Sequence, residues 1–252
     1  NLRASRSFPF ASKALGVNFI REATRVILGA EPSGDSVKSP LDLDYVVVKA
    51  PQFSFRRLTG ADPKLGVEMA STGEVACFGD DRDEALLKAL LATGFHYPCK
   101  GVLLSLGLKD EKYRFIEEAK ILTGLGLILY ATPGTAKALQ AEGIQCTSLA
   151  KGRPRGNKPN ALKYLAESRI DLVINLPIGY DRQGRPDGYL IRRCATDLEI
   201  PLVTDMWLAR RIVQALTRYQ KRDLKVKSWA EYVPQIALQN IKSNADKLNF
   251  KK

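Results

Sequence analysis

Between residues 101 and 220 the sequence alternates between short apolar runs of strand length and segments with helical periodicity. Strands that are apolar throughout and separated by helices are typical of a parallel sheet whose two faces are both covered. We therefore predict an α/β fold with a doubly wound parallel sheet. The expected strands are 101–106, 126–131, 144–150, 171–176 and 201–204, and the expected helices are 110–123, 135–142, 160–168, 189–198 and 205–220.

The connection after the strand 126–131 is the most informative of these. It consists of the turn Thr132-Pro133-Gly134-Thr135, and a helix follows from Ala136. The first turn of a helix leaves backbone N–H groups unpaired and carries the positive end of the helix dipole, which favours an anion. The two threonine hydroxyls add donors. The turn therefore predicts an anion site; the alternative is an ordinary strand–helix connection, in which glycine and threonine are common.

Two further polar segments follow strands of the predicted sheet. The basic loop 151–157 comes after the strand 144–150, and Asn175 lies at the end of the strand 171–176. In sheets of this kind ligands bind beyond the carboxyl ends of the strands. We therefore expect these segments and the turn at 132–135 to lie around one opening at the carboxyl edge of the sheet.

The first 13 residues carry dense polar chemistry before the chain turns apolar. Arg3 and Arg6 are three residues apart, and Asn1 precedes them. An arginine fork binds phosphate through two parallel hydrogen bonds, and an asparagine carbonyl is a metal ligand. The segment thus has the groups needed to contact a phosphate and a metal ion.

The pattern before residue 100 is less regular. Gly29 and Pro51 are the expected stops of a helix and of a buried strand. The expected elements are a helix over 12–28, a strand over 45–50, a helix to Leu91 capped by Asp81 or Asp83, and a domain boundary at 96–100.

The composition is that of a globular protein. Of its 252 residues 45% are hydrophobic and 26% are charged, and the length accommodates one large or two small domains. No apolar run reaches the roughly 18 residues of a membrane span. The chain begins at Asn1 without a Met or the apolar core of a signal peptide, so we expect a segment of a larger intracellular protein.

Cysteine and histidine usage limits the chemistry. Cys77, Cys99, Cys146 and Cys194 are far apart and form no Cys-x-x-Cys pair, which is typical of free thiols in a reducing compartment and not of a zinc ribbon. The single histidine, His96, cannot form a cluster of histidine ligands, and we interpret it as a bystander in a linker.

The chain has a net charge of +12 and a pI of about 9.6. Nucleic acid, anionic metabolites or an acidic partner surface would each attract such a chain. We interpret the basic residues after 210 as a solvated helix face with a polar tail, because no nucleic-acid module accompanies them. A nucleic-acid binder with salt-dependent affinity is the alternative. The residues concerned are Arg210, Arg211, Arg218, Lys221, Arg222, Lys225 and Lys227.

Two long motifs make the chain recognisable. Asn1-Leu-Arg-Ala-Ser-Arg-Ser-Phe-Pro-Phe-Ala-Ser-Lys13 and Glu68-Met-Ala-Ser-Thr-Gly-Glu74 closely resemble the end of the second ATP-grasp domain of the carbamoyl-phosphate synthetase large subunit. Residues 97–220 resemble that subunit's allosteric domain, which is similar to methylglyoxal synthase. The resemblance implies a truncated ATP-grasp portion over 1–95 and a methylglyoxal synthase-like domain with a basic tail over 97–252. The tail 226–232, with no dihydroorotase behind it, looks most like the arginine-pathway enzymes of fungi.

The resemblance implies a ligase that makes carbamoyl phosphate from bicarbonate, glutamine-derived ammonia and two ATP, for arginine or pyrimidine biosynthesis. Asn1 matches the family's magnesium ligand, and Arg3 and Arg6 match arginines of the phosphate site. The parent enzyme would use Mg or Mn and ATP. It would work with the remainder of the large subunit and a glutamine amidotransferase, in the cytoplasm or the mitochondrial matrix. The isolated segment is expected to be inactive and without a cofactor, since the nucleotide-binding lobes lie before Asn1.

The family's effector site matches Thr132, Thr135, Lys151 and Asn175. Acetylglutamate-activated relatives have Trp in place of Lys151 and asparagines at the positions of Ile178 and Gly188, and the bacterial ornithine-binding Glu is Ala50 here. The resemblance therefore favours a nucleoside monophosphate over these activators, and no nucleic acid or membrane as partner. The alternative is a pocket that survives only as scaffold.

An active lyase or phosphate-binding domain of the methylglyoxal synthase type is the other alternative. Its chemistry needs a carboxylate base near the phosphate. The loop 152–160 lacks the synthase's Gly-Gly-Asp and has Arg155-Gly156-Asn157 in its place, and Asp181 and Asp187 do not match the motif positions. The sequence thus favours the regulatory interpretation.

Overall fold

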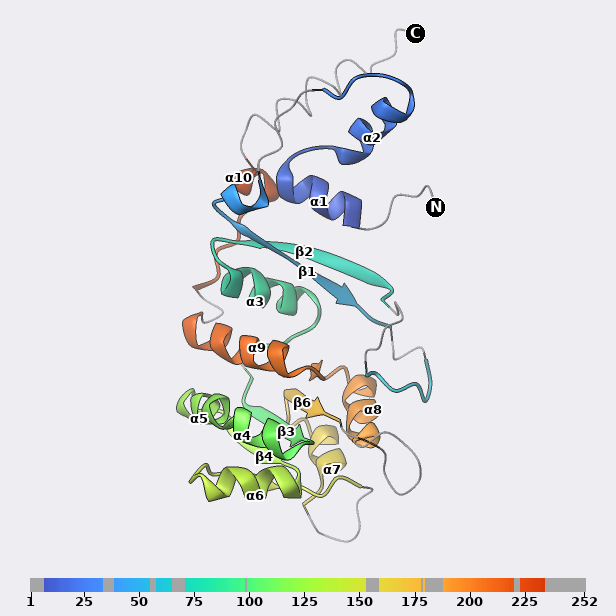
Figure 1. Ribbon diagram of the computed structural model, residues 1–252. Coiled ribbons are helices and arrows are strands. Elements are labelled where there is room, and N and C mark those ends of the chain that lie inside the picture. Colours follow the sequence, from blue (N-terminus) through green and yellow to red (C-terminus); the bar gives the residue numbers. More distant parts are fainter. Residues whose placement is uncertain are drawn as a thin grey trace.

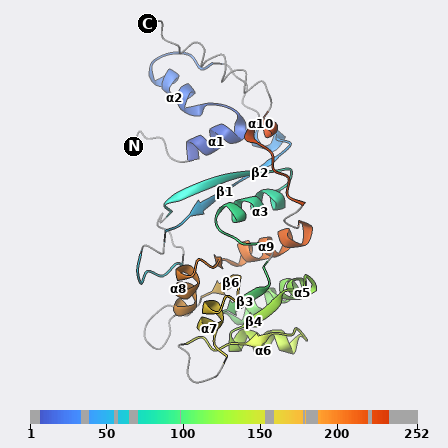
Figure 2. The same ribbon diagram turned by 180° about the vertical axis from the view of Figure 1, so that it is seen from behind.

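The computed structural model describes residues 7–33, 39–54, 58–64, 71–97, 99–152, 159–177, 179, 188–219 and 223–233. The molecule is elongated, and its layers follow one another along the long axis in both views (Figures 1 and 2). From one end to the other these are α1 (Ser7–Leu15) with α2 (Phe19–Ile27), the strand pair β1 (Val46–Gln52) and β2 (Gly73–Gly79), α3 (Arg82–Ala92), α9 (Met206–Arg218), a five-stranded sheet, and α6 (Pro133–Ala141).

The five-stranded sheet is parallel throughout, with strand order β5-β4-β3-β6-β7. Its central strand β3 pairs on one side with β4, where Leu104 is opposite Ala131, and on the other with β6, where Ser105 is opposite Asn175. The strands are β3 (Gly101–Leu106), β4 (Ile128–Ala131), β5 (Thr147–Ser148), β6 (Leu172–Leu176) and β7 (Leu202–Val203). The predicted doubly wound parallel sheet is confirmed.

Successive residues of β3 pack into two separate cores, because side chains alternate between the faces of a strand. Val102 and Leu104 lie in one core with α5, α6 and α9, whereas Leu103 lies in the other with α7 and α8. The helices are α4 (Lys109–Arg114), α5 (Ile116–Gly124), α7 (Ala161–Ala166) and α8 (Tyr189–Asp197). Burial on both faces explains why all six residues of β3 are apolar or small and fully buried.

Several expected elements of this half differ in their bounds from the structure. The helix over 110–123 is divided into α4 and α5 at Phe115, whose ring is fully buried in the core. The strand expected over 144–150 is reduced to Thr147–Ser148, with an isolated bridge between Ala150 and Asn160. The last expected strand, 201–204, keeps only Leu202–Val203.

The N-terminal part also departs from expectation. The single helix over 12–28 is wrong, because the chain turns at Gly16, whose φ of +69° is a conformation that favours glycine. The Asn18 side chain then caps α2. Pro51 does not end the strand but lies within β1, opposite Glu74. Among the described residues β1 and β2 form a sheet of two edge strands, where proline is tolerated.

The core of the sheet domain extends across the expected boundary at residue 96. Leu86 and Leu87 of α3, together with Phe95, belong to the same cluster of buried side chains as α9 and the central strands. In Figures 1 and 2, α3 lies directly between the β1–β2 pair and α9. The helix before the boundary is therefore packed as part of the domain behind it.

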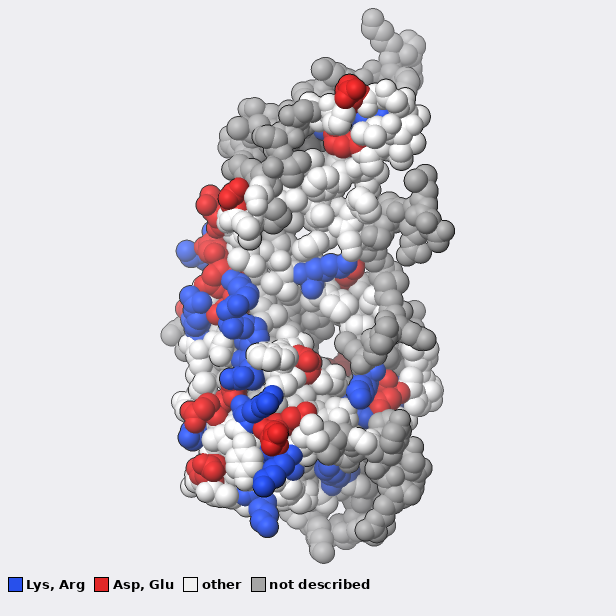
Figure 3. Space-filling model, viewed as in Figure 1, with Lys and Arg blue, Asp and Glu red and all other residues white. Residues whose placement is uncertain are grey.

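Ion pairs reinforce the contact between α3 and α9. They also correct the interpretation of the basic residues after 210 as a solvated helix face, since several of these residues are paired. The carboxylate of Asp83, with 3% of the residue exposed, accepts hydrogen bonds from Arg211 and Arg218 at 3.1 Å each. Further pairs join Arg210 to Glu118 at 2.7 Å and Lys227 to Asp80 at 2.6 Å. On the face in Figure 3, basic side chains gather along one edge over α3 and α9, with acidic side chains among them.

Candidate effector-binding site

The connection from β4 to α6 is held by two buried hydroxyls. The Thr135 hydroxyl accepts from the Leu106 amide at 3.0 Å and lies 3.2 Å from the Leu106 carbonyl oxygen, to which it donates. The Thr132 hydroxyl donates to that of Thr135 at 3.3 Å. Thr132 is 1% and Thr135 0% exposed. The two hydroxyls therefore join the end of β3 to the start of α6, which begins at Pro133 and not at Ala136.

A lysine that the sequence did not single out lies over the first turn of α6. A Cβ placed on Gly134 would be 3.5 Å from Nζ of Lys112, so the ammonium group of this α4 lysine lies close to the first turn of α6. Nothing local in the sequence indicates this contact. The available signal is topological: α4 follows β3, the neighbour of β4, so both helices begin at the same edge of the sheet.

Asn175 lies at the same edge on β6, with 1% of its surface exposed. It is opposite Ser105 of β3, and Thr132 follows β4 on the other side of β3. Two strand spacings, or roughly 10 Å, separate the backbones of β4 and β6. Lys151 follows the bridge at Ala150, next to the outer strand β5. The four predicted effector residues thus share the carboxyl edge of the sheet, and Thr132 and Thr135 touch each other.

Asn175 is bonded to a buried arginine that sequence reasoning missed. Nη1 of Arg192 donates to Oδ1 of Asn175 at 2.6 Å, while Nε and Nη2 donate to the two carboxylate oxygens of Asp62 at 2.7 and 2.6 Å. Arg192 is 0% exposed. Burial acts to raise the pKa of Asp62, but hydrogen bonds from Arg192 and from the Lys64 amide outweigh it and hold that pKa below 3.8.

The first turns of α8 hold the whole loop that carries Asp62. Tyr189 donates from its hydroxyl to the Gly60 carbonyl at 2.8 Å. Arg193 donates to the carbonyls of Leu58 and Ala61 at 3.1 and 3.0 Å. This loop, residues 58–64, belongs to the N-terminal half of the chain. The sheet domain is therefore attached to that half directly beside Asn175.

Asn175 and Arg192 leave no space for a side chain at Gly188. Its φ is +76°, and a Cβ there would lie 2.6 Å from Nδ2 of Asn175 and 3.1 Å from Nη1 of Arg192. Contacts this short exclude a side chain at position 188 unless Asn175 or Arg192 moves. An asparagine at this position, as the resemblance gives for acetylglutamate-activated enzymes, would therefore require Asn175 or Arg192 to move.

Several predicted residues lie outside the described residues. These are Asn1, Arg3 and Arg6, the position Ile178, and parts of the loop 151–157 and of the motif 68–74. The residues described hold no group of three or more His, Cys, Asp or Glu side chains arranged to bind a metal. The magnesium and phosphate ligands therefore stay predictions. No helix in the described part of the chain has the length and apolarity needed to cross a membrane.

All four cysteines are free, as predicted. Burial raises the pKa of the Cys77, Cys146 and Cys194 thiols, and it raises that of Cys99 to about 11. A thiol with a raised pKa carries little thiolate at neutral pH and is a poor nucleophile. The cysteines are therefore structural residues and not candidates for covalent catalysis.

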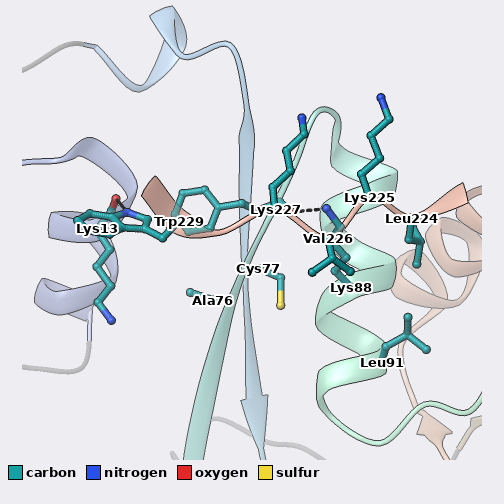
Figure 4. A pocket seen from close by; sticks show the side chains of 11 residues that line it. Lys13, Ala76, Cys77, Lys88, Leu91, Leu224, Lys225, Val226, Lys227 and Trp229 are labelled. Carbon is teal, nitrogen blue, oxygen red and sulfur yellow. Dashed lines mark hydrogen bonds between the residues drawn. The ribbon is translucent and has the colours of Figure 1, made fainter. Parts of the chain in front are cut away.

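A cavity of about 610 Å³ lies away from the effector residues, between α1, β2, α3 and the segment 224–229 (Figure 4). Its walls are mainly apolar, and lysines from α1, α3 and the segment 224–229 stand around it. Two of these lysines are already paired, Lys88 with Glu84 at 2.9 Å and Lys227 with Asp80 at 2.6 Å. No residue predicted from the sequence to bind a ligand lines this cavity.

The family model of the MGS-like domain matches residues 114–204, which contain α6, β6 and most of the sheet. This part of the chain is an MGS-like domain. A solved methylglyoxal synthase from Elizabethkingia anophelis covers 45% of this chain and 76% of its own, at 18% identity and a TM-score of 0.34. The assignment of this domain rests on the family match.

The chain as a whole is a relative of carbamoyl-phosphate synthases. It is 43% identical over 232 residues to the mitochondrial carbamoyl-phosphate synthase [ammonia] of Homo sapiens, covering 89% of this chain and 15% of that protein. It is 47% identical over 227 residues to multifunctional protein URA2 of Saccharomyces cerevisiae, covering 86% and 10%, and 44% identical over 229 residues to multifunctional protein CAD of Squalus acanthias, also covering 86% and 10%.

These matches confirm the resemblance to carbamoyl-phosphate synthetases. The chain spans only between 10% and 15% of the length of these relatives. Their names do not separate an arginine-pathway enzyme from a pyrimidine-pathway enzyme. The similarity to the arginine-pathway enzymes of fungi therefore stays a prediction.

Proposed function

We propose that this chain is a segment of the synthetase subunit of a glutamine-hydrolysing carbamoyl-phosphate synthase, and that its sheet domain binds the regulatory effector. The parent enzyme makes carbamoyl phosphate from bicarbonate, glutamine-derived ammonia and two ATP for arginine or pyrimidine biosynthesis. Identities of 43–47% to the relatives, over more than four fifths of this chain, support the first part. The donor groups at the carboxyl edge of the sheet support the second.

The single observation that carries the effector site is the first turn of α6. This turn lies close to Nζ of Lys112 and follows the buried Thr132, and Asn175 and Lys151 lie at the same edge. Hydrogen bonds to a charged group contribute about 1.5–3 kcal/mol each and neutral ones about 1 kcal/mol. A phosphate offers enough acceptors for several of these donors. The effector proposed is therefore a nucleoside monophosphate such as uridine or inosine monophosphate.

The test compares three lysines in a thermal-shift titration with these two nucleotides. Lys112→Ala and Lys151→Ala should each weaken binding at least tenfold, or about 1.4 kcal/mol. Lys137→Ala is the matched control, because this lysine is exposed on α6 one helical step past the turn. Equal losses in all three variants would mean that general positive charge, and not this site, attracts the nucleotide.

In the parent enzyme we propose that Asn1 binds the catalytic Mg or Mn ion and that Arg3 and Arg6 contact the phosphates of ATP. Mg²⁺ and arginine neutralise the charge that develops on a transferred phosphoryl group. The partners proposed are the remainder of the large subunit and a glutamine amidotransferase subunit or domain, in the cytoplasm or the mitochondrial matrix.

The catalytic half of this proposal has its own test. The isolated chain, incubated with carbamate and MgATP, should form no carbamoyl phosphate, because it spans only 10–15% of the length of the relatives. Carbamoyl phosphate formed by this chain alone would overturn that expectation. Loss of carbamoyl-phosphate synthesis in the parent enzyme after Arg3→Ala or Arg6→Ala, with its folding unchanged, would support the assignment.

A further inference from the structure

Arg192 occupies an unusual place between two parts of the chain. It is fully buried, yet its partners come from a strand of the sheet domain and from the loop 58–64 of the N-terminal half. Asp62 and Arg192 are 130 positions apart in the sequence. A buried guanidinium is costly unless its donors are paired, so both sets of bonds matter to its position.

The guanidinium also determines how Asn175 presents its amide. Arginine has donors only, so the amide oxygen of Asn175 must face Nη1, where it accepts at 2.6 Å. The amide nitrogen Nδ2 is then the group left for a ligand. Gly188 places no side chain beside that nitrogen, since a Cβ there would lie 2.6 Å from it. Asn175 therefore offers a hydrogen-bond donor, which suits phosphate or carbonyl oxygens.

We propose that Arg192 is a positioning residue that turns the Asn175 amide into a donor for the effector and couples this amide, through Asp62, to the loop 58–64. The first part, the orientation of the Asn175 amide toward an effector, determines specificity and rests on the proposed effector site. The second part is the structural link from Asn175 through Arg192 and Asp62 to the loop 58–64, here called the tie, and it does not depend on that site. Coupling between two sites is reciprocal. An effector that engages Asn175 changes the order of the loop, and a change in the loop alters effector affinity.

The tie is tested without ligand by hydrogen exchange and mass spectrometry on the full 252-residue chain. Asn175→Ala removes the hydrogen bond from Nη1 of Arg192 to the Asn175 amide oxygen, and exchange of the amides in 58–64 should rise about threefold or more, a change at the lower end of measured pair couplings. Thr132→Val is the matched control, because Thr132 lies at the same sheet edge but is bonded to Thr135. An unchanged loop in Asn175→Ala, or an equal rise in both variants, overturns the tie.

The coupling is tested with uridine monophosphate and, as a second probe, inorganic phosphate. The nucleotide should alter exchange in 58–64 of the unmodified chain, and Arg192→Lys should remove that response and weaken binding about tenfold, since lysine lacks the fork. Arg193→Lys is the control: Arg193 holds the same loop, whereas the described partner of the Asn175 side chain is Arg192. Asp62→Asn should also remove the response, and it serves if Arg192→Lys does not fold.

The outcomes separate the two proposals. If neither probe binds the unmodified chain, the effector site fails together with the specificity part, while the ligand-free experiment still decides the tie. If the nucleotide binds but the loop does not respond, the coupling is overturned. It is likewise overturned if Arg192→Lys and Arg193→Lys lose the response equally.

Discussion

A single hydroxyl joins Thr135 of α6 to Leu106 at the end of β3, accepting from the amide at 3.0 Å and donating to the carbonyl 3.2 Å away. The residue predicted to bind an effector thus already has a structural task. Because Thr135 is 0% exposed and the bonds are buried, no water replaces them when the hydroxyl is removed.

Thr135→Val should therefore destabilise the chain even without a ligand. The change keeps the shape of the side chain but removes the Thr135 partner of two buried backbone groups of Leu106, each at a cost of about 1–3 kcal/mol. Thr135→Ser keeps the hydroxyl and should recover most of the loss. Urea denaturation measures both. A valine variant as stable as the unmodified chain would show that the hydroxyl is not needed for folding.

Gly188→Ala should cost more than Gly143→Ala. Both glycines have φ near +75°, at +76° and +75°, so both variants carry the same backbone strain, about 1–2 kcal/mol. At Gly143 nothing lies within 4 Å of the new Cβ, whereas at Gly188 it meets Asn175 at 2.6 Å. The difference in the free energy of unfolding isolates that collision. Equal losses would mean that Asn175 moves aside freely.

The helix α3 should stabilise the sheet domain although it precedes the predicted boundary. A segment covering 80–233 is expected to unfold at a higher temperature than one covering 97–233. The longer segment keeps Leu86, Leu87 and Phe95 in the shared core, and each buried side chain of this size contributes about 1.5–3 kcal/mol.

The matched point variant in the full chain is Leu87→Ala. Leu87 is 4% exposed, so its truncation should cost about 2–5 kcal/mol. Scanning calorimetry would show whether the loss appears in the transition of the sheet domain. Equal melting temperatures for the two segments would mean that α3 does not stabilise the sheet domain and that the domain begins after residue 96.

Asp62 should contribute to stability at neutral pH and lose that contribution in acid. Its pKa is lower in the folded chain than its ordinary value of 3.8, so protons bind more tightly to the unfolded state. The stabilisation is present above 3.8 and is lost as the pH falls from there through the lowered folded value. Asp62→Asn should therefore be less stable at neutral pH and less sensitive to acid.

Urea denaturation between about pH 2 and pH 6 measures this slope, since acid unfolding reflects carboxylates that must be protonated. Asp42→Asn, at an exposed residue of the 3₁₀ helix Pro40–Asp42, is the control for replacing a carboxylate by an amide at the surface. The expectation fails if Asp62→Asn follows the acid dependence of the unmodified chain.

Much of the sheet domain was determined by local sequence pattern. The apolar runs predicted the strands of the parallel sheet, most closely β3 and β6, because these central strands are buried on both faces and admit few polar residues. The outer strand β5 is exposed and is shorter than expected. The turn before α6 predicted where donors gather, since a helix start leaves N–H groups unpaired wherever it occurs. Errors arose where a single residue changed the backbone, as at Gly16, whose positive φ divides the expected helix 12–28.

The tertiary structure alone decided which groups meet across the fold. Periodicity reports which face of an element is buried, not which distant element covers it. The contact of Arg192 with Asp62 spans 130 positions, and that of Arg218 with Asp83 spans 135. Both depend on how the layers stack, as does the placement of Lys112 over α6. The sequence therefore predicted four residues as candidates for an effector site, whereas Lys112 and the connection of Asn175 to the N-terminal half are evident only in the folded chain.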